Sequence, residues 1–207
     1  MPNATIEGKD CTLFFDYDHD NGVLKALSDN GKIEWLEKRM NMIFLDPLRK
    51  IIDRKSNIFP QIEHPGGHPM TVMLMVVSLL MNGMEALGSF LTNSTNNNQR
   101  FFAFVSKYMS SWNAQVNSPH HGTLPLSGIL WKSYRNGLAH SFAILHAGIE
   151  ADDTNNKYHI SGGVVQIDAW KLFDDLLLGV SQMFKDVRTN SSAKQLFIDR
   201  FNKVYDC

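Results

Sequence analysis

Residues 69–84, PMTVMLMVVSLLMNGM, carry no charged side chain, and this stretch decides the fold class. It is 16 residues long, whereas a helix that crosses a bilayer needs about 20 apolar residues. It also contains Asn82 and Gly83 and runs directly into Glu85. A helix that is apolar on all sides is typical of a protein interior. The sequence therefore predicts a central, nearly fully buried helix over residues 71–91, with Glu85 near the end that reaches solvent or a polar partner.

Helical periodicity continues on both sides of this stretch. Apolar residues between 33 and 44 recur at spacings of three and four. Asp46 and Pro47 then match an N-cap and a first-turn proline, which predicts a second short helix. Asp168 is the expected N-cap of a later helix, and Ser191 or Ser192 that of the last one. Further helices are predicted over residues 101–112, 126–136, 169–187 and 193–205.

The remaining segments predict loops and one β-hairpin. Residues 92–99 (TNSTNNNQ) and 117–125 (NSPHHGTLP) are typical of loops. Two runs rich in β-forming residues, FAILHAGIE and KYHISGGVVQI, flank the polar ADDTNN and predict a hairpin over about 142–167. Residues 1–32 give only weak signals. The expected fold is mainly α: one domain spanning residues 1–207, a helical bundle with one inserted β-hairpin.

Composition limits the classes of function. The 207 residues suffice for one domain with a real core. With 20 basic and 21 acidic side chains the net charge is −1, so nucleic acid could be attracted only by a local basic patch. Two cysteines, Cys11 and Cys207, are too few for a disulfide framework and favour a reducing compartment. The N-terminal residues lack a secretory signal pattern. We therefore expect a soluble cytoplasmic protein that does not enter a membrane.

The acidic stretch DYDHDNG, residues 16–22, is a candidate calcium loop. Asp16, Asp18 and Asp20 alternate like positions 1, 3 and 5 of an EF-hand. However, glycine stands at position 7 instead of 6, and position 12 is Leu27, where a bidentate glutamate is required. We interpret the stretch as an acidic, solvated turn.

Two pairs of histidines are candidate metal ligands. His64 and His68 are four residues apart, and His120 and His121 are adjacent. A zinc site needs three or four convergent donors, but two glycines between prolines separate the first pair and prevent a helix there. No CxxC or HExxH motif supports them. The favoured interpretation is loop histidines without a metal, and no cofactor is predicted.

The most informative cluster is RNGLAH, residues 135–140, which lies in an otherwise apolar segment. On a continuous helix Arg135 and His140 would point about 140° apart, whereas Asn136 and His140, four apart, would share a face. Gly137 could end the helix before the histidine, so that the two side chains converge. They could also converge across a two-fold axis between two chains. The spacing leaves these alternatives open.

An arginine beside a histidine has a defined chemical use. Guanidinium is always charged and binds phosphate oxygens in pairs, while imidazole accepts or donates a proton near neutral pH. Together they suffice for metal-free cleavage of RNA, in which the base activates the 2′-hydroxyl and the cation stabilises the developing charge. The alternative is structural: Arg135 near a helix C-terminus is favoured by the macrodipole, and His140 caps carbonyl groups.

Arg135, Asn136 and His140 at the end of a helix in an α-helical protein resemble the HEPN superfamily, whose signature is arginine, four to six residues, then histidine. The resemblance covers six residues and their helical context. It implies a small helical bundle that dimerises and places two motifs in a shared cleft. It also implies either a metal-independent ribonuclease of toxin–antitoxin, antiviral or RNA-processing systems, or an inactive member that binds nucleotides or RNA. The predicted hairpin departs from the plain bundle.

Two hypotheses of different classes follow. In the first, Arg135 and His140 are catalytic residues of a ribonuclease, Asn136 supports them, and a homodimer forms the cleft. In the second, the chain is a non-catalytic helical module that binds RNA, a nucleotide or a protein such as an antitoxin. A third, weaker hypothesis is a metal hydrolase that uses the loop histidines. Basic runs at residues 37–39 and 49–55 would favour the nuclease if they flanked the motif.

Overall fold

A computed structural model describes residues 3–13, 22–52, 70–137, 147–150 and 156–207. Over these residues the chain is mainly helical, as predicted. The helices are α2 (Asp29–Arg39), η1 (Met40–Leu45), α3 (Asp46–Ile52), α4 (Met70–Gly88), α5 (Asn97–Tyr108), η2 (Ser110–Asn113), α6 (Leu126–Ile129), η3 (Leu130–Arg135), α8 (Ala169–Thr189) and α9 (Ser191–Tyr205). The strands are β1 (Asn3–Ile6), β2 (Lys9–Thr12), β3 (Gln115–Ser118), β4 (Gly122–Pro125), β5 (Ala147–Glu150), β6 (Tyr158–Ser161) and β7 (Val164–Asp168).

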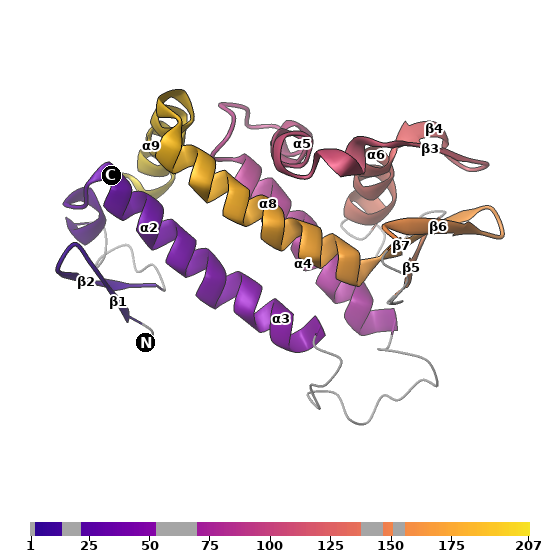
Figure 1. Cartoon of the computed structure of the whole chain (residues 1–207), viewed down its shortest axis with the longest axis horizontal. Coiled ribbons are helices and arrows are strands. Elements are labelled where there is room, and N and C mark those ends of the chain that lie inside the picture. Colours follow the sequence, from indigo (N-terminus) through magenta and orange to yellow (C-terminus); the bar gives the residue numbers. More distant parts are fainter. Residues whose placement is uncertain (1–2, 14–21, 53–69, 138–146, 151–155) are drawn as a thin grey trace.

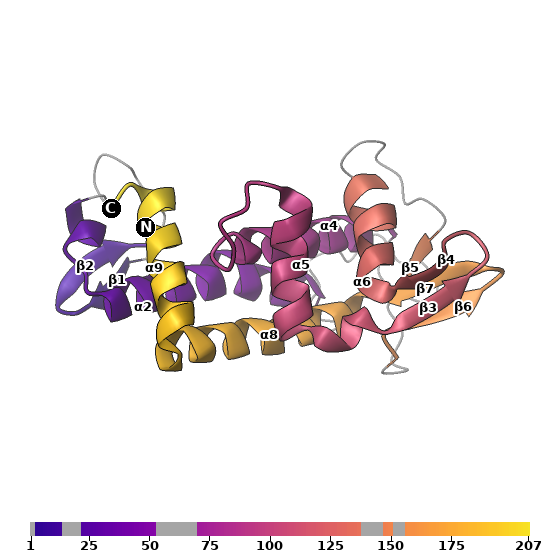
Figure 2. The same cartoon turned by 90° about the horizontal axis from the view of Figure 1, so that it is seen from above.

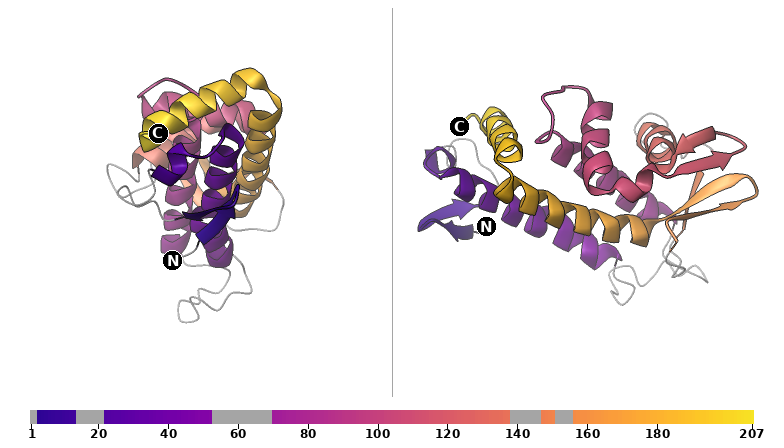
Figure 3. Two further views of the ribbon diagram at one scale, coloured as in Figure 1. Left: turned by 90° about the vertical axis from the view of Figure 1, so that its left-hand side faces the viewer. Right: turned by 45° about the horizontal axis from the view of Figure 1, so that its top comes forward.

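The helices form two sets in an elongated molecule. Helices α2, α4 and α8 run along the long axis, and α9, α5 and α6 cross them (Figures 1 and 2). Strands β1 and β2 lie at one end of the molecule, and the other strands lie at the opposite end. Figure 3 shows the same arrangement from one end and in an oblique view with its top turned forward. None of the helices in the described segments is long and apolar enough to span a bilayer.

The helices α2, η1 and α3 form one continuous rod, so the predicted N-cap at Asp46 is wrong. Asp46 has helical backbone angles (φ −68°, ψ −41°), and its N–H donates to the carbonyl of Asn41, five residues earlier. The next residue, Pro47, has no N–H and its ring crowds the preceding turn. The wider π-turn of η1 accommodates the proline without ending the helix.

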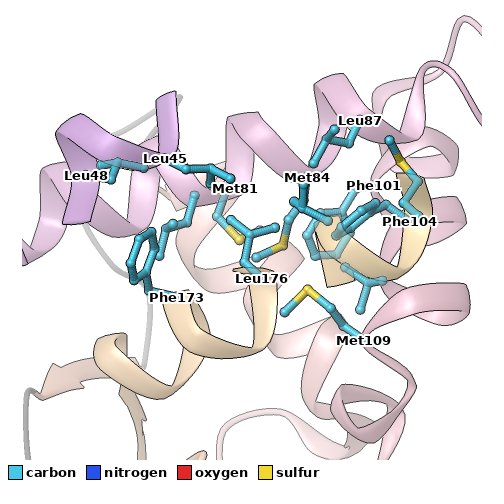
Figure 4. Packing of buried hydrophobic residues seen from close by; sticks show 14 of the residues in the cluster. Leu45, Leu48, Met81, Met84, Leu87, Phe101, Phe104, Met109, Phe173 and Leu176 are labelled. Atoms are coloured by element: carbon cyan, nitrogen blue, oxygen red, sulfur yellow. The ribbon is translucent and has the colours of Figure 1, made fainter. Parts of the chain in front are cut away.

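Helix α4 is the centre of the core, but it is not buried on all sides. Its side chains Met81 and Met84 pack near Leu176 of α8 and Phe104 of α5 (Figure 4). In contrast, Met75 is 64% exposed, and Leu79, one turn later, is 40% exposed. Residues four apart share a helix face, so α4 has one exposed apolar strip. The prediction of a nearly fully buried helix is wrong for this face, because an all-apolar sequence does not specify how many faces are covered.

Helices α4 and α5 approach each other closely at Gly88. A Cβ atom at this position would lie 1.8 Å from the carbonyl oxygen of Arg100 and 2.5 Å from its carbonyl carbon. The neighbouring atoms belong to the backbone and cannot move aside as a flexible side chain does. Glycine at this position therefore allows the two helices to pack in direct backbone contact.

Gly88→Ala is expected to destabilise the protein by about 1–3 kcal/mol, because the two helices must separate to accommodate the added methyl group. Thermal unfolding followed by circular dichroism measures this loss. Gly22→Ala is the matched control, since a Cβ there meets nothing within 4 Å and the residue has no positive φ. Equal melting temperatures for the two variants would contradict the close approach.

The described strands form three small sheets, where the sequence predicted one hairpin. Strands β1 and β2 pair within the N-terminal segment, from which little regular structure was expected. Strands β3 and β4 form a second hairpin in the segment predicted as a loop. Gly122, the first residue of β4 after the turn, has φ +66°. Val116 and Ser118 are the buried positions of the alternating strand β3. The alternation was missed in the sequence because prolines and short polar residues of this segment are typical of loops.

The third sheet has the order β5-β7-β6, and its hairpin joins β6 to β7. Ser161 pairs with Val164, which leaves a two-residue turn at Gly162 and Gly163, both with positive φ. Such turns match the twist of paired strands. Strand β5 adds in parallel to β7, so ADDTNN is not the hairpin turn. The segment does contain a hairpin, but with a different turn from the one predicted.

The caps of the last two helices show how local hydrogen bonds fix helix starts. Asp168 caps α8 as predicted, because its carboxylate accepts from the N–H of Lys171 at 2.9 Å. For α9 the N-cap is Asn190, whose side chain accepts from the N–H groups of Ser192 and Ala193. The predicted serine caps were thus one or two residues late, since an asparagine side chain is an equally good acceptor.

Candidate functional site

The motif arginine lies at the end of a helix with an irregular hydrogen-bond pattern. Helix α6 continues into the π-helical η3, in which the N–H of Asn136 donates to the carbonyl of Trp131. Residues 136 and 137 are also helical, so the helix does not end before Gly137. π-Turns are rare in helices and frequent at functional sites. His140, the second residue of the motif, lies outside the described residues.

Arg135 forms an ion pair with Glu85 of α4. Its Nε and Nη2 atoms both donate to Glu85 Oε2, each at 3.2 Å. The Arg135 side chain is 18% exposed and the Glu85 side chain 15% exposed. The sequence predicted that Glu85 would meet solvent or a polar partner, and Arg135 is that partner. The pair joins residues 50 positions apart in the chain.

Trp131 contacts the other side of the arginine. The Arg135 guanidinium carbon lies 5.5 Å from the centre of the Trp131 ring, within the range of a cation–π interaction. Trp131 in turn packs against Phe101 of α5, with ring centres 5.3 Å apart. The guanidinium is therefore held between a carboxylate and an anchored aromatic ring. Of its five N–H donors, Glu85 takes one on Nε and one on Nη2. Within the described parts of the chain, the edge formed by Nη1 and Nη2 has no further hydrogen-bond partner.

The residues before Arg135 attach the same helix to two other elements. The Oγ of Ser133, which is fully buried, lies 3.2 Å from Nε2 of His121 in the β3–β4 turn. The hydroxyl of Tyr134, also fully buried, donates to the carbonyl of Gly148 in β5. Three consecutive residues thus contact three different parts of the protein. This arrangement fixes the rotation of η3 and with it the direction of the Arg135 side chain.

One of the histidines considered as metal ligands, His121, is held by hydrogen bonds in the β3–β4 hairpin. The N–H of His121 donates to Ser118 Oγ, so both backbone and ring of His121 take part in hydrogen bonds of the hairpin. Over the described segments, no three His, Cys, Asp or Glu side chains lie close enough to hold a metal ion. His64, His68 and the candidate calcium loop at residues 16–20 lie outside those segments.

The basic run at residues 37–39 makes contacts away from the motif. Glu37 pairs with Arg188 of α8, and Lys38 pairs with Glu34 on its own helix. Arg39 donates to the carbonyl of Leu13 near the N-terminal hairpin. In the second run, Arg49 pairs with Asp46. None of these contacts involves Arg135, and residues 53–55 of the second run lie outside the described residues.

Sequence reasoning selected Arg135 and Asn136 but missed the two side chains that contact the arginine. Trp131 lies four residues before Arg135, and this spacing places both on one helix face, so it was recognisable. The pairing with Glu85 joins two helices and has no local signal in the sequence. Asn136 is half-buried at the end of the described helix.

Comparisons of the chain with protein-family models, with curated proteins and with solved structures find no match.

Proposed function

We propose that the protein is a HEPN-like, metal-independent endoribonuclease in which Arg135 and His140 act on RNA and Asn136 supports the histidine. The observation that carries the proposal is the fixed Arg135 guanidinium. Glu85 and Trp131 hold it at the start of the motif, and among the described residues nothing else pairs with the Nη1–Nη2 edge, whose N–H donors suit a phosphate. Guanidinium matches phosphate oxygens in this bidentate way.

The chemistry needs one proton acceptor and one cation. His140 takes the proton from a ribose 2′-hydroxyl, and the oxygen attacks the adjacent phosphorus. The bond from phosphorus to the 5′-oxygen of the next nucleotide breaks, and that oxygen takes up the proton that His140 has accepted. Arg135 stabilises the charge that grows on the phosphate oxygens in the transition state. Asn136, four residues before His140, orients the imidazole if the helix continues to that residue.

RNA cleavage is expected to persist in excess EDTA, because neither Arg135 nor His140 needs a metal ion. The products should carry a 2′,3′-cyclic phosphate or a 3′-phosphate, as attack by the neighbouring hydroxyl requires. Gel analysis of labelled oligonucleotides before and after phosphatase treatment identifies these ends. Loss of cleavage on chelation would contradict the mechanism and point to His64, His68, His120 and His121.

A homodimer is expected, because a second copy can complete a site whose arginine and histidine diverge on one helix. Two-fold pairing is also the commonest closed assembly. Sedimentation velocity at micromolar concentration measures the mass directly. A strict monomer under these conditions would count against a cleft shared by two motifs.

A non-catalytic binding module is the second candidate, and two observations favour it. The carboxylate of Glu85 neutralises Arg135 and so weakens its attraction for phosphate. The exposed apolar strip of Met75 and Leu79 is the kind of surface that binds another protein, such as an antitoxin. A folded wild type that binds RNA or a protein partner but leaves single-stranded and structured RNAs uncut would establish this candidate in place of the nuclease.

A further inference from the structure

We infer that Glu85 is a positioning residue of the proposed cleavage site, which sets the direction in which Arg135 faces the scissile phosphate; the inference rests on the proposed function. Glu85 does not touch the substrate. Its carboxylate takes the Nε–Nη2 side of the guanidinium, so that the Nη1–Nη2 edge is presented to the phosphate.

The need for positioning follows from the arginine side chain itself. A free arginine has many rotamers, and ordering it on substrate binding costs conformational entropy. In this protein the ordering is already present, since Glu85 contributes two hydrogen bonds and Trp131 a ring contact. Groups held in place before the reaction lower its barrier, because no reorganisation is needed in the transition state.

The position of Glu85 on a rigid element makes it suited to this role. It lies near the C-terminal end of α4, whose neighbouring residues Met84 and Leu87 are buried in the core. Gly83, two residues earlier, allows the Phe44 ring of η1 to pack directly against the α4 backbone. The carboxylate is therefore attached to a helix whose adjoining residues are packed in the core, which fixes its position.

If Glu85 positions Arg135, substitutions of Glu85 should lower kcat without raising KM. A negative charge beside the arginine opposes phosphate binding in the ground state while it orients the guanidinium for the transition state. Glu85→Gln retains an oxygen acceptor but removes the charge. Its kcat is expected to fall about tenfold, while its KM stays the same or falls. Glu85→Ala removes the acceptor, and its kcat is expected to fall about 10²-fold.

The experiment compares wild type, Glu85→Gln and Glu85→Ala in EDTA, with an RNA oligonucleotide for kcat and KM. The same oligonucleotide with 2′-deoxy sugars, which cannot be cleaved, gives the dissociation constant. Glu37→Gln is the matched control, because it removes another interhelical glutamate–arginine pair, that with Arg188. Its kcat and KM should equal those of the wild type. All rates are measured below the melting temperature of every variant.

Wild-type kcat and KM in both single Glu85 variants would overturn the positioning role while the nuclease proposal stands. A wild type that does not cleave RNA would overturn both together.

Discussion

His140→Ala is expected to lower the rate of RNA cleavage by roughly 10²–10⁴-fold, the usual contribution of a general acid or base. The substitution removes the proton acceptor for the 2′-hydroxyl and leaves Arg135 and its contacts with Glu85 and Trp131 in place. Binding of an uncleavable 2′-deoxy oligonucleotide should therefore persist. Single-turnover cleavage at saturating protein measures the rate of the chemical step.

His159→Ala is the matched control for this experiment. His159 lies on β6 and is exposed, outside the proposed site, so its loss should leave cleavage unchanged. A second motif variant, Arg135→Lys, keeps the charge but loses the planar fork of donors and should also impair cleavage. If the His140 and Arg135 variants instead melt early and cleave normally at low temperature, the two residues are structural caps.

Val76→Asp is expected to unfold the protein. Val76 is 1% exposed in the middle of α4, where a carboxylate would lose its hydration without gaining a partner. Burying an unpaired charge costs several kcal/mol in real proteins, which is comparable with the total stability of about 5–15 kcal/mol. Circular dichroism and size-exclusion chromatography measure the loss of folded protein.

Met75→Asp is the matched control, because Met75 is the adjacent residue on the same helix and is 64% exposed. This variant should remain folded, with a small change in melting temperature. A folded Val76→Asp variant with unchanged melting would contradict the placement of α4 in the core. Early melting of both variants would show that the exposed face of α4 is covered in solution.

The helices were predictable because their signals are local. Apolar spacing located α2, α4, α5, α8 and α9, and the carboxylate of Asp168 marked the start of α8. The small sheets were harder to predict, since β3 and β4 are four residues each and contain turn-forming residues. The parallel pairing of β5 with β7 joins segments separated in the chain, and no local pattern encodes it.

Part of the candidate site was also predictable, because its signal is local in the sequence. Arg135 and Asn136 belong to a short motif, which can be read from the sequence. The partner of Arg135 could not be read, because Glu85 lies 50 residues earlier and meets it only through the packing of η3 on α4. The exposed strip on α4 also escaped prediction, since Met75 and Val76 are both apolar and only the packing of neighbouring helices distinguishes them.

The π-turn of η3 sets the direction in which the Arg135 side chain leaves the helix. A π-turn contains one residue more than the α-helical turn that it replaces. If the same residues were wound as a regular α-helix, Arg135 would be turned by about 100° relative to the preceding helix. Arg135 would then point away from Glu85. The π-turn thus absorbs one surplus residue of the backbone and keeps the guanidinium facing Glu85.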